Sequence, residues 1–190
     1  MQNKILILVL SIIVIALLGT TFAVPMTEMT ATISGSSSQT TATYFGATSN
    51  NVYNSWGNVS NEFSGSSGTI HSDVMNGIAM ITASLVLMIL GIVFTLLTIV
   101  FAFVDKGGRL VKLLMPLLGV IFVGTSIALF IAGTSSVASG DALLIQGFFP
   151  SATVTTGLAY GIYIAFAGLI VGIITLVFSL KAKPKKAETS

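Results

Sequence analysis

The residues best suited to acid–base chemistry are His71 and Asp73, which lie two positions apart. Side chains at positions i and i+2 share a face on a strand, so the two can form a hydrogen-bonded pair that transfers a proton. No partnered serine nucleophile is signalled beside them, and the chain has no cysteine. We therefore predict no catalytic residue and interpret His71 and Asp73 as a solvated pair.

A metal site is not predicted either. The chain has one histidine and six scattered acidic residues, whereas protein metal sites are built from clustered His, Cys and carboxylate ligands. The net charge of +2 is too small to indicate a nucleic-acid partner. We expect a protein that is not an enzyme and that uses no cofactor, no metal, no nucleic acid and no small-molecule substrate.

The composition is that of an integral membrane protein. Hydrophobic residues make up 54% of the 190 residues and charged residues 7%, against about 25% charged residues in soluble domains. A membrane helix needs roughly 20 apolar residues, and four segments meet this length. The predicted transmembrane helices are 1–24, 77–104, 113–132 and 158–180; the first and second extracellular loops are 25–76 and 133–157; the cytoplasmic parts are the turn 105–112 and the tail 181–190.

The positions of the basic residues predict the orientation of these spans. Segments 25–76 and 133–157 contain no basic residue. Because cytoplasmic segments carry an excess of Lys and Arg, we expect both termini and the 105–112 turn to be cytoplasmic, in the plasma membrane. The basic residues are Lys4, Lys106, Arg109, Lys112, Lys181, Lys183, Lys185 and Lys186.

The first apolar run has a second interpretation. Lys4, the apolar segment and the sequence Thr21-Phe22-Ala23 resemble a secretory signal with a cleavage site. Cleavage after residues 1–23 would leave three spans. The apolar run of about 20 residues exceeds the usual apolar region of a secretory signal, about 7–15 residues, so we predict that this segment is retained.

The first predicted loop contains patches that favour strands. Residues 26–34 (MTEMTATIS) and 41–48 (TATYFGAT) are rich in Thr, with Ile, Tyr and other strand-forming residues, and turn residues separate them. A disordered tether is the alternative. We expect a membrane all-α fold, a four-transmembrane-helix bundle, with a small β-rich extracellular cap. Trp56 is the predicted anchor of this cap, and Asn58-Val59-Ser60 fits the N-glycosylation pattern at Asn58.

The second predicted loop contains an apolar stretch too short to span a membrane, LLIQGFFP at 143–150. It either packs on the first loop and the membrane surface or forms a contact patch for another molecule. The candidate contact residues are Leu143, Leu144, Ile145, Phe148 and Phe149.

Small residues in the fourth predicted span recur at helical spacing. They are Gly157, Gly161, Ala165, Gly168 and Gly172. Small side chains on one helix face let helices approach closely in lipid. The stripe predicts close packing, either inside the chain or between copies of it.

The layout and two stretches resemble the claudin and peripheral-myelin-protein superfamily. Residues 79–103 followed by DKGGR are similar to its second span and inner turn, and residues 157–181 are similar to its fourth span, rich in Gly and aromatic residues. The chain has Trp56-Gly57 but lacks the second tryptophan and the two cysteines of the family's first outer loop. The resemblance implies that Trp56 takes the place of the loop tryptophan.

The function expected from these features is structural. The resemblance implies a protein that organises membrane domains, adhesion or a barrier by contact with copies of itself or other membrane proteins, and the pattern at Asn58 predicts that it is a glycoprotein. The alternatives are a non-catalytic accessory subunit of a channel or transporter complex and a cation-favouring pore lined by acidic outer loops.

Overall fold

The structure is a computed structural model that describes residues 2–65, 68–103 and 108–181. Its elements are α1 (Gln2–Thr20), β1 (Thr27–Ile33), β2 (Ser36–Ala42), β3 (Gly46–Ser49), β4 (Val52–Ser55), α2 (Trp56–Phe63), α3 (Thr69–Phe103), α4 (Arg109–Phe148), β5 (Thr153–Leu158) and α5 (Tyr160–Lys181).

The apolar helices account for the membrane character of the sequence. In the described part of the chain, three helices are long and apolar enough to cross a membrane: Thr69–Phe103, Leu110–Phe148 and Tyr160–Lys181. The apolar helix Lys4–Thr20 is shorter. These three helices are consistent with integration into a membrane.

The predicted all-α bundle of four transmembrane helices is wrong. Within residues 2–65, 68–103 and 108–181, five helices are combined with a five-stranded antiparallel sheet, and three helices rather than four meet the length and composition of a span. The first apolar helix ends at Thr20, where the hydroxyls of Thr20 and Thr21 donate to the carbonyls of Leu17 and Leu18, at 2.7 and 2.6 Å. Pro25 then leads into β1, since its ring cannot continue a helix.

Two helices are longer than the hydropathy of the sequence indicated. The helix predicted at 77–104 begins at Thr69, and the helix predicted at 113–132 continues to Phe148, into the segment predicted as the second loop. The added turns hold together because small residues face each other: a Cβ on Gly133 would lie 2.7 Å from the carbonyl oxygen of Gly77. Serine and glycine lower the hydropathy of α4 after residue 132 without breaking the helix. The hydropathy pattern therefore placed the end of this helix too early.

The sheet has the order β4-β3-β2-β1-β5, and every pair is antiparallel. Ser34-Gly35 and Asn50-Asn51 have positive φ angles and join β1 to β2 and β3 to β4. Two-residue turns of this kind match the twist of a hairpin. β5 comes from the far end of the chain and pairs with β1 in the register Thr27↔Leu158 to Thr32↔Thr153.

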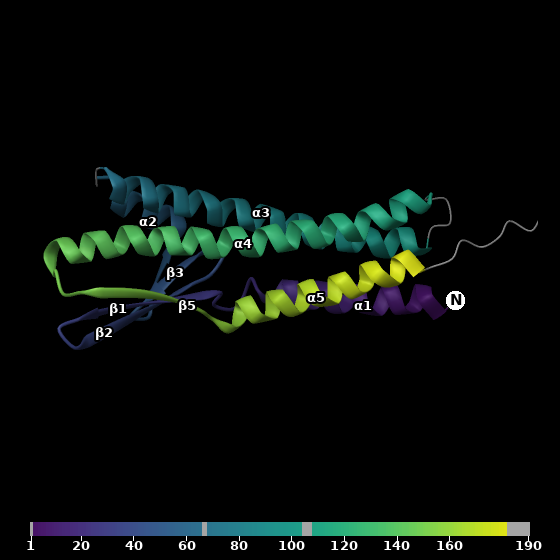
Figure 1. Cartoon of the computed structure of the whole chain (residues 1–190), viewed down its shortest axis with the longest axis horizontal. Coiled ribbons are helices and arrows are strands. Elements are labelled where there is room, and N and C mark those ends of the chain that lie inside the picture. Colours follow the sequence, from purple (N-terminus) through teal and green to yellow (C-terminus); the bar gives the residue numbers. More distant parts are fainter. Residues whose placement is uncertain (1, 66–67, 104–107, 182–190) are drawn as a thin grey trace, which may run out of the picture.

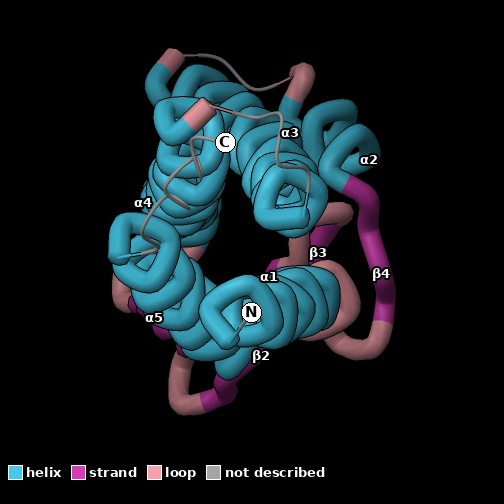
Figure 2. Tube along the Cα trace, turned by 90° about the vertical axis from the view of Figure 1, so that its right-hand side faces the viewer, coloured by secondary structure: helices cyan, strands magenta, loops and turns pink. Residues whose placement is uncertain are grey.

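The helices and the sheet share one elongated body. Figure 1 shows α3 and α4 running along its whole length, with α1 and α5 side by side against one half and the sheet against the other. Viewed from the end, α1, α3, α4 and α5 surround a common centre (Figure 2). Met29, Ala42 and Tyr44 from the sheet side share a buried core with Phe130 and Val137 of α4.

Exposed apolar side chains gather on the half of the body that contains α1 and α5. We call this surface the apolar belt. On α3 it extends from Val86 to Phe103, which is about 27 Å at 1.5 Å per residue and close to the ~30 Å of a bilayer's hydrocarbon. Its other exposed side chains include Ile5, Val9 and Ile12 of α1, Leu110, Leu114, Leu117 and Ile121 of α4, and Ile170, Ile173, Val177 and Leu180 of α5.

The exposed face of α4 changes character beyond the belt. After Ile121 the exposed residues are small or polar: Thr125, Ala128, Ala132, Ser135 and Ser139. Tyr160 and Tyr163 are exposed at the sheet end of α5, and tyrosine is enriched at membrane–water interfaces. The sheet therefore lies beyond the part of the body whose surface suits lipid.

Candidate association surface

An exposed apolar patch lies at the end of α4. Leu143, Phe148 and Phe149 are 44%, 76% and 50% exposed, and Leu144 is also exposed. We call these four residues the α4 tip. Figure 1 shows this end of α4 opposite the N-terminus. Ile145, predicted with them, is half-buried.

The α4 tip is far from the apolar belt. Ile121 is the last large apolar residue of the belt on α4, and a helix rising 1.5 Å per residue places Phe148 about 40 Å beyond it. No residue from 142 to 158 is charged. Exposed, uncharged aromatic residues outside a lipid-type surface are typical of contact sites.

Hydrogen bonds in the turn after α4 hold the backbone that carries the aromatic residues of the tip. The backbone N–H of Phe149 donates to the carbonyl of Ile145 at 2.7 Å, and that of Ala152 donates to Phe149 at 2.9 Å. The Gln146 amide donates to the carbonyl of Ala152 at 3.3 Å. Because β5 then pairs with β1, the sheet holds the tip from one side and α4 holds it from the other.

Tyr44 joins the sheet to the long helices. Its side chain is 1% exposed, and its hydroxyl lies 3.2 Å from Oγ of Ser126. Ser126 donates its one proton to the carbonyl of Ser84 at 2.6 Å, so Tyr44 is the donor to Ser126. The Tyr44 ring also packs edge-on against Phe130, with ring centroids 4.8 Å apart.

Burial raises the pKa of the Tyr44 hydroxyl to about 12, while the hydrogen bond with Ser126 acts in the opposite direction. Desolvation disfavours the phenolate because a charge is costly away from water. The side chain therefore remains a neutral hydrogen-bond donor throughout the physiological pH range.

Trp56 holds the turn that carries Tyr44. Its indole N–H donates to the carbonyl of Thr43 at 3.1 Å, and its backbone N–H donates to Phe45 at 3.3 Å. Trp56 is buried and begins α2, whose first turn is capped by Ser55 accepting from the N–H of Asn58. Trp56, the predicted anchor, thus supports the turn at 43–45, and Tyr44 is the residue that packs against the helices.

The small residues predicted to line one helix face have contacts inside the chain. Gly168 of α5 packs against Leu18 of α1, Gly172 faces Val120 of α4, and Ala165 is fully buried. The backbone N–H of Gly161 donates to Pro25 at 2.9 Å.

Gly157 does not belong to that helix face. It lies in β5 opposite Glu28, and α5 begins only at Tyr160. The correction follows from strand pairing, because Thr153 to Leu158 satisfy their backbone groups against β1 instead of starting a helix.

The remaining predicted residues occupy separate places. Asn58 is exposed on α2. His71 and Asp73 lie on α3, where side chains two apart do not share a face; His71 Nδ1 lies 3.2 Å from the carbonyl of Phe63. Among the residues that the structure describes, no group of His and acidic side chains fits a metal.

The basic residues are described in part. Lys4, Lys112 and Lys181 lie on α1, α4 and α5, and Arg109 is the first residue of α4. Figure 1 shows the corresponding ends of the three helices at the end of the body that holds the N-terminus. Lys106, Lys183, Lys185 and Lys186 lie outside the described residues.

The contact of Tyr44 with the helices is hard to predict from the sequence. Tyr44 stands in a strand-forming patch that also contains Phe45, which is exposed, so the residue types alone do not identify the buried one. The available signal is Ser126 inside an apolar helix, since a buried hydroxyl in such a place needs a partner.

Comparison with known proteins adds no family. No protein-family model matches the chain, and no curated protein matches its sequence. The resemblance to the claudin superfamily therefore stays a prediction from the sequence.

Proposed function

We propose that this chain is a non-catalytic membrane protein that organises its membrane by associating through the α4 tip. The observation that carries the proposal is the exposure of Leu143, Phe148 and Phe149 on an uncharged surface about 40 Å beyond the apolar belt. Aromatic residues such as phenylalanine are enriched in protein interfaces.

The proposed occupant of the α4 tip is a second copy of this chain. Segment 142–158 is uncharged, so the four residues of the α4 tip themselves bring no like charges together. The nearest acidic residue on α4, Asp141, lies one turn before Leu144 and is half-buried. Association of this kind supports adhesion, a barrier or the clustering of copies in a membrane. Contact with a different membrane protein would make the chain an accessory subunit of a larger complex.

We also propose that the protein lies in the plasma membrane. In this proposal the end of the body that holds the start of α1 and the last turn of α5 faces the cytoplasm. Lys4, Lys112 and Lys181 lie at that end, and the excess of basic residues on cytoplasmic segments supports this orientation. Protease added outside intact cells should spare the tail after Lys181. Loss of that tail would contradict the orientation.

The association test compares two polar substitutions at exposed apolar positions. We expect the chain in mild detergent to have a mass of at least twice its 19.7 kDa, and Phe148→Ser with Phe149→Ser to shift it to the monomer. Val52→Ser, an exposed change on β4, is the matched control and should keep the larger mass.

Three other results are decisive. A wild-type chain that is monomeric and without a partner contradicts the proposal. A larger mass that persists in the Phe148 and Phe149 variant places the contact elsewhere. A single additional protein of a different mass, lost in the same variant, identifies the accessory-subunit function instead.

A further inference from the structure

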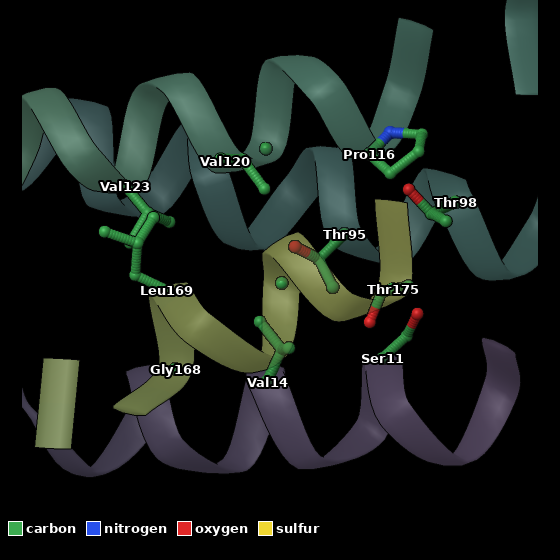
Figure 3. Close-up of a pocket in the computed structure, with 12 residues that line it drawn as sticks. Ser11, Val14, Thr95, Thr98, Pro116, Val120, Val123, Gly168, Leu169 and Thr175 are labelled. Carbon is green, nitrogen blue, oxygen red and sulfur yellow. The ribbon is translucent and has the colours of Figure 1, made fainter. Parts of the chain in front are cut away.

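The centre of the body, between α1, α3, α4 and α5, contains a small cavity lined with hydroxyl groups. Its volume is about 20 Å³, and its polar side chains are Ser11 of α1, Thr95 and Thr98 of α3, and Thr175 of α5. Figure 3 shows these side chains with Pro116 and Val120 of α4, so all four helices contribute. The cavity lies at the level of the apolar belt, between Val93 and Val100 on α3.

The hydroxyl groups around the cavity are not all satisfied by the protein. The threonines each donate to a carbonyl four residues earlier on their own helix: Thr95 to Gly91, Thr98 to Phe94 and Thr175 to Val171, at 2.8 to 2.9 Å. Their oxygens retain lone pairs that can accept. Ser11 is 0% exposed, and its Oγ has no hydrogen-bond partner in the described part of the chain.

A buried hydroxyl without a partner is costly, by about 1–3 kcal/mol in proteins. The environment of Ser11 therefore suits a small molecule that accepts a hydrogen bond from the Ser11 hydroxyl and donates hydrogen bonds to the threonine oxygens. Among the residues that the structure describes, no charged side chain lines the cavity, so none of them neutralises a bound ion. Water has the required donors and acceptors and carries no charge.

The size of the cavity agrees with this ligand. A single water needs about 10–15 Å³, and the cavity of about 20 Å³ has room for a water molecule. We propose that one water molecule occupies this cavity and bridges Ser11 to threonine hydroxyls of α3 and α5. The bridge attaches α1, the shortest of the four helices, to the centre of the body.

The direct test uses the intact protein in lipid bilayers. Solid-state NMR with transfer of magnetisation from water should show a slowly exchanging water close to Ser11 and Gly172, both of which line the cavity. The same measurement at Met88, which is fully buried elsewhere on α3, is the negative control. Transfer at Ser11 equal to that at Met88 would show a dry cavity and overturn the proposal.

Substitutions give a second test in which the sign of the change decides. With a bridging water, Ser11→Ala removes a partner of that water and lowers the midpoint temperature of unfolding. Without a water, the same change removes an unsatisfied donor and leaves the midpoint unchanged or raises it, which contradicts the proposal.

The threonine side of the bridge is tested against a matched threonine. Thr175→Val should lower the midpoint more than Thr134→Val, because Thr134 is also buried and also donates to its own helix but lies outside the cavity. The Ser11→Ala and Thr175→Val losses should be less than additive, since both act on one water. Equal losses at Thr175 and Thr134, or full additivity, would count against a shared water.

Discussion

The hydroxyl of Tyr44 lies 3.2 Å from Oγ of Ser126, and 82 positions separate the two residues in the sequence. One comes from the connection between two strands, the other from the middle of the longest helix. Their hydrogen bond continues to the carbonyl of Ser84 on α3. This relay links three parts of the chain where the sheet half of the body meets the apolar belt.

Loss of the Tyr44 hydroxyl should weaken the contact between the sheet and the helices without leaving a cavity. Tyr44→Phe keeps the ring against Phe130 and should lower the free energy of unfolding by about 1 kcal/mol, the net value of one hydrogen bond. Tyr53→Phe is the control, since the Tyr53 hydroxyl donates to Phe45 on an exposed side chain. Denaturation by SDS in mixed micelles measures the free energy of unfolding of both variants. Equal losses in the two variants would contradict a specific contribution of the Tyr44 hydrogen bond.

Alkaline pH should destabilise the protein through Tyr44. Its pKa is raised from 10.0 to about 12 by burial, so the unfolded chain loses this proton at a lower pH than the folded chain does. The stabilising contribution is complete below pH about 10 and is lost as the pH rises to about 12, with a total on the order of 2–3 kcal/mol.

The measurement is the free energy of unfolding of wild type and of Tyr44→Phe between pH 8 and 12.5, in steps of ~0.5 pH units. The difference between the two proteins is used because it cancels the titration of the lysines. We expect the wild-type advantage to shrink as the pH passes through this window and then to reverse, because the expected loss exceeds the advantage of about 1 kcal/mol. An advantage that stays constant to the end of the window would contradict a buried, neutral Tyr44.

Trp56 gives a direct optical report on the turn at 43–45, because it is the one tryptophan in the sequence. Wild type should show blue-shifted emission and slow quenching by acrylamide, as expected for a buried indole. Trp56→Ala should cost about 3–5 kcal/mol and speed proteolysis between residues 25 and 65, while membrane insertion persists. Trp56→Phe keeps most of the packing but loses the hydrogen bond to Thr43. An unchanged protease pattern in Trp56→Ala would refute the role of this residue.

Two glycines on α4 should respond oppositely to alanine. In Gly133→Ala the new methyl would lie 2.7 Å from the carbonyl oxygen of Gly77, so α3 and α4 must separate, at a cost of about 1–3 kcal/mol. In Gly124→Ala the nearest atoms, on Leu169, are at ordinary contact distance, so better helix propensity should stabilise by up to about 1 kcal/mol. The free energies of unfolding of both variants decide, and similar values would argue against the close contact.

Local patterns predicted individual elements better than they predicted the fold class. The apolar runs at 77–104 and 158–180 coincide with most of α3 and α5, since long uninterrupted hydrophobic segments have few alternatives to a helix. Threonine-rich alternation marked residues 26–34 and 41–48, where β1 and parts of β2 and β3 lie. The four-span interpretation failed at residues 1–24, because the run of apolar letters hides the early helix end at Thr20 and Thr21.

Long-range relationships were beyond the sequence pattern. The extension of α4 to Phe148 depends on contacts such as that between Gly133 and Gly77, which no local window contains. The same holds for β5, which becomes a strand because β1 offers an unpaired edge. In the candidate association surface the apolar residue types were visible in advance, but their place at the end of a helix was not.

The pairing of β1 with β5 also sets an order of events during synthesis. More than a hundred residues separate Ile33 from Thr153, so the ribosome completes β1 to β4, α3 and α4 before β5 exists. At about 5–20 residues per second, the edge of β1 stays open for roughly ten seconds. The nascent chain therefore passes through a stage in which a strand edge is available to other chains, and the arrival of β5 closes it.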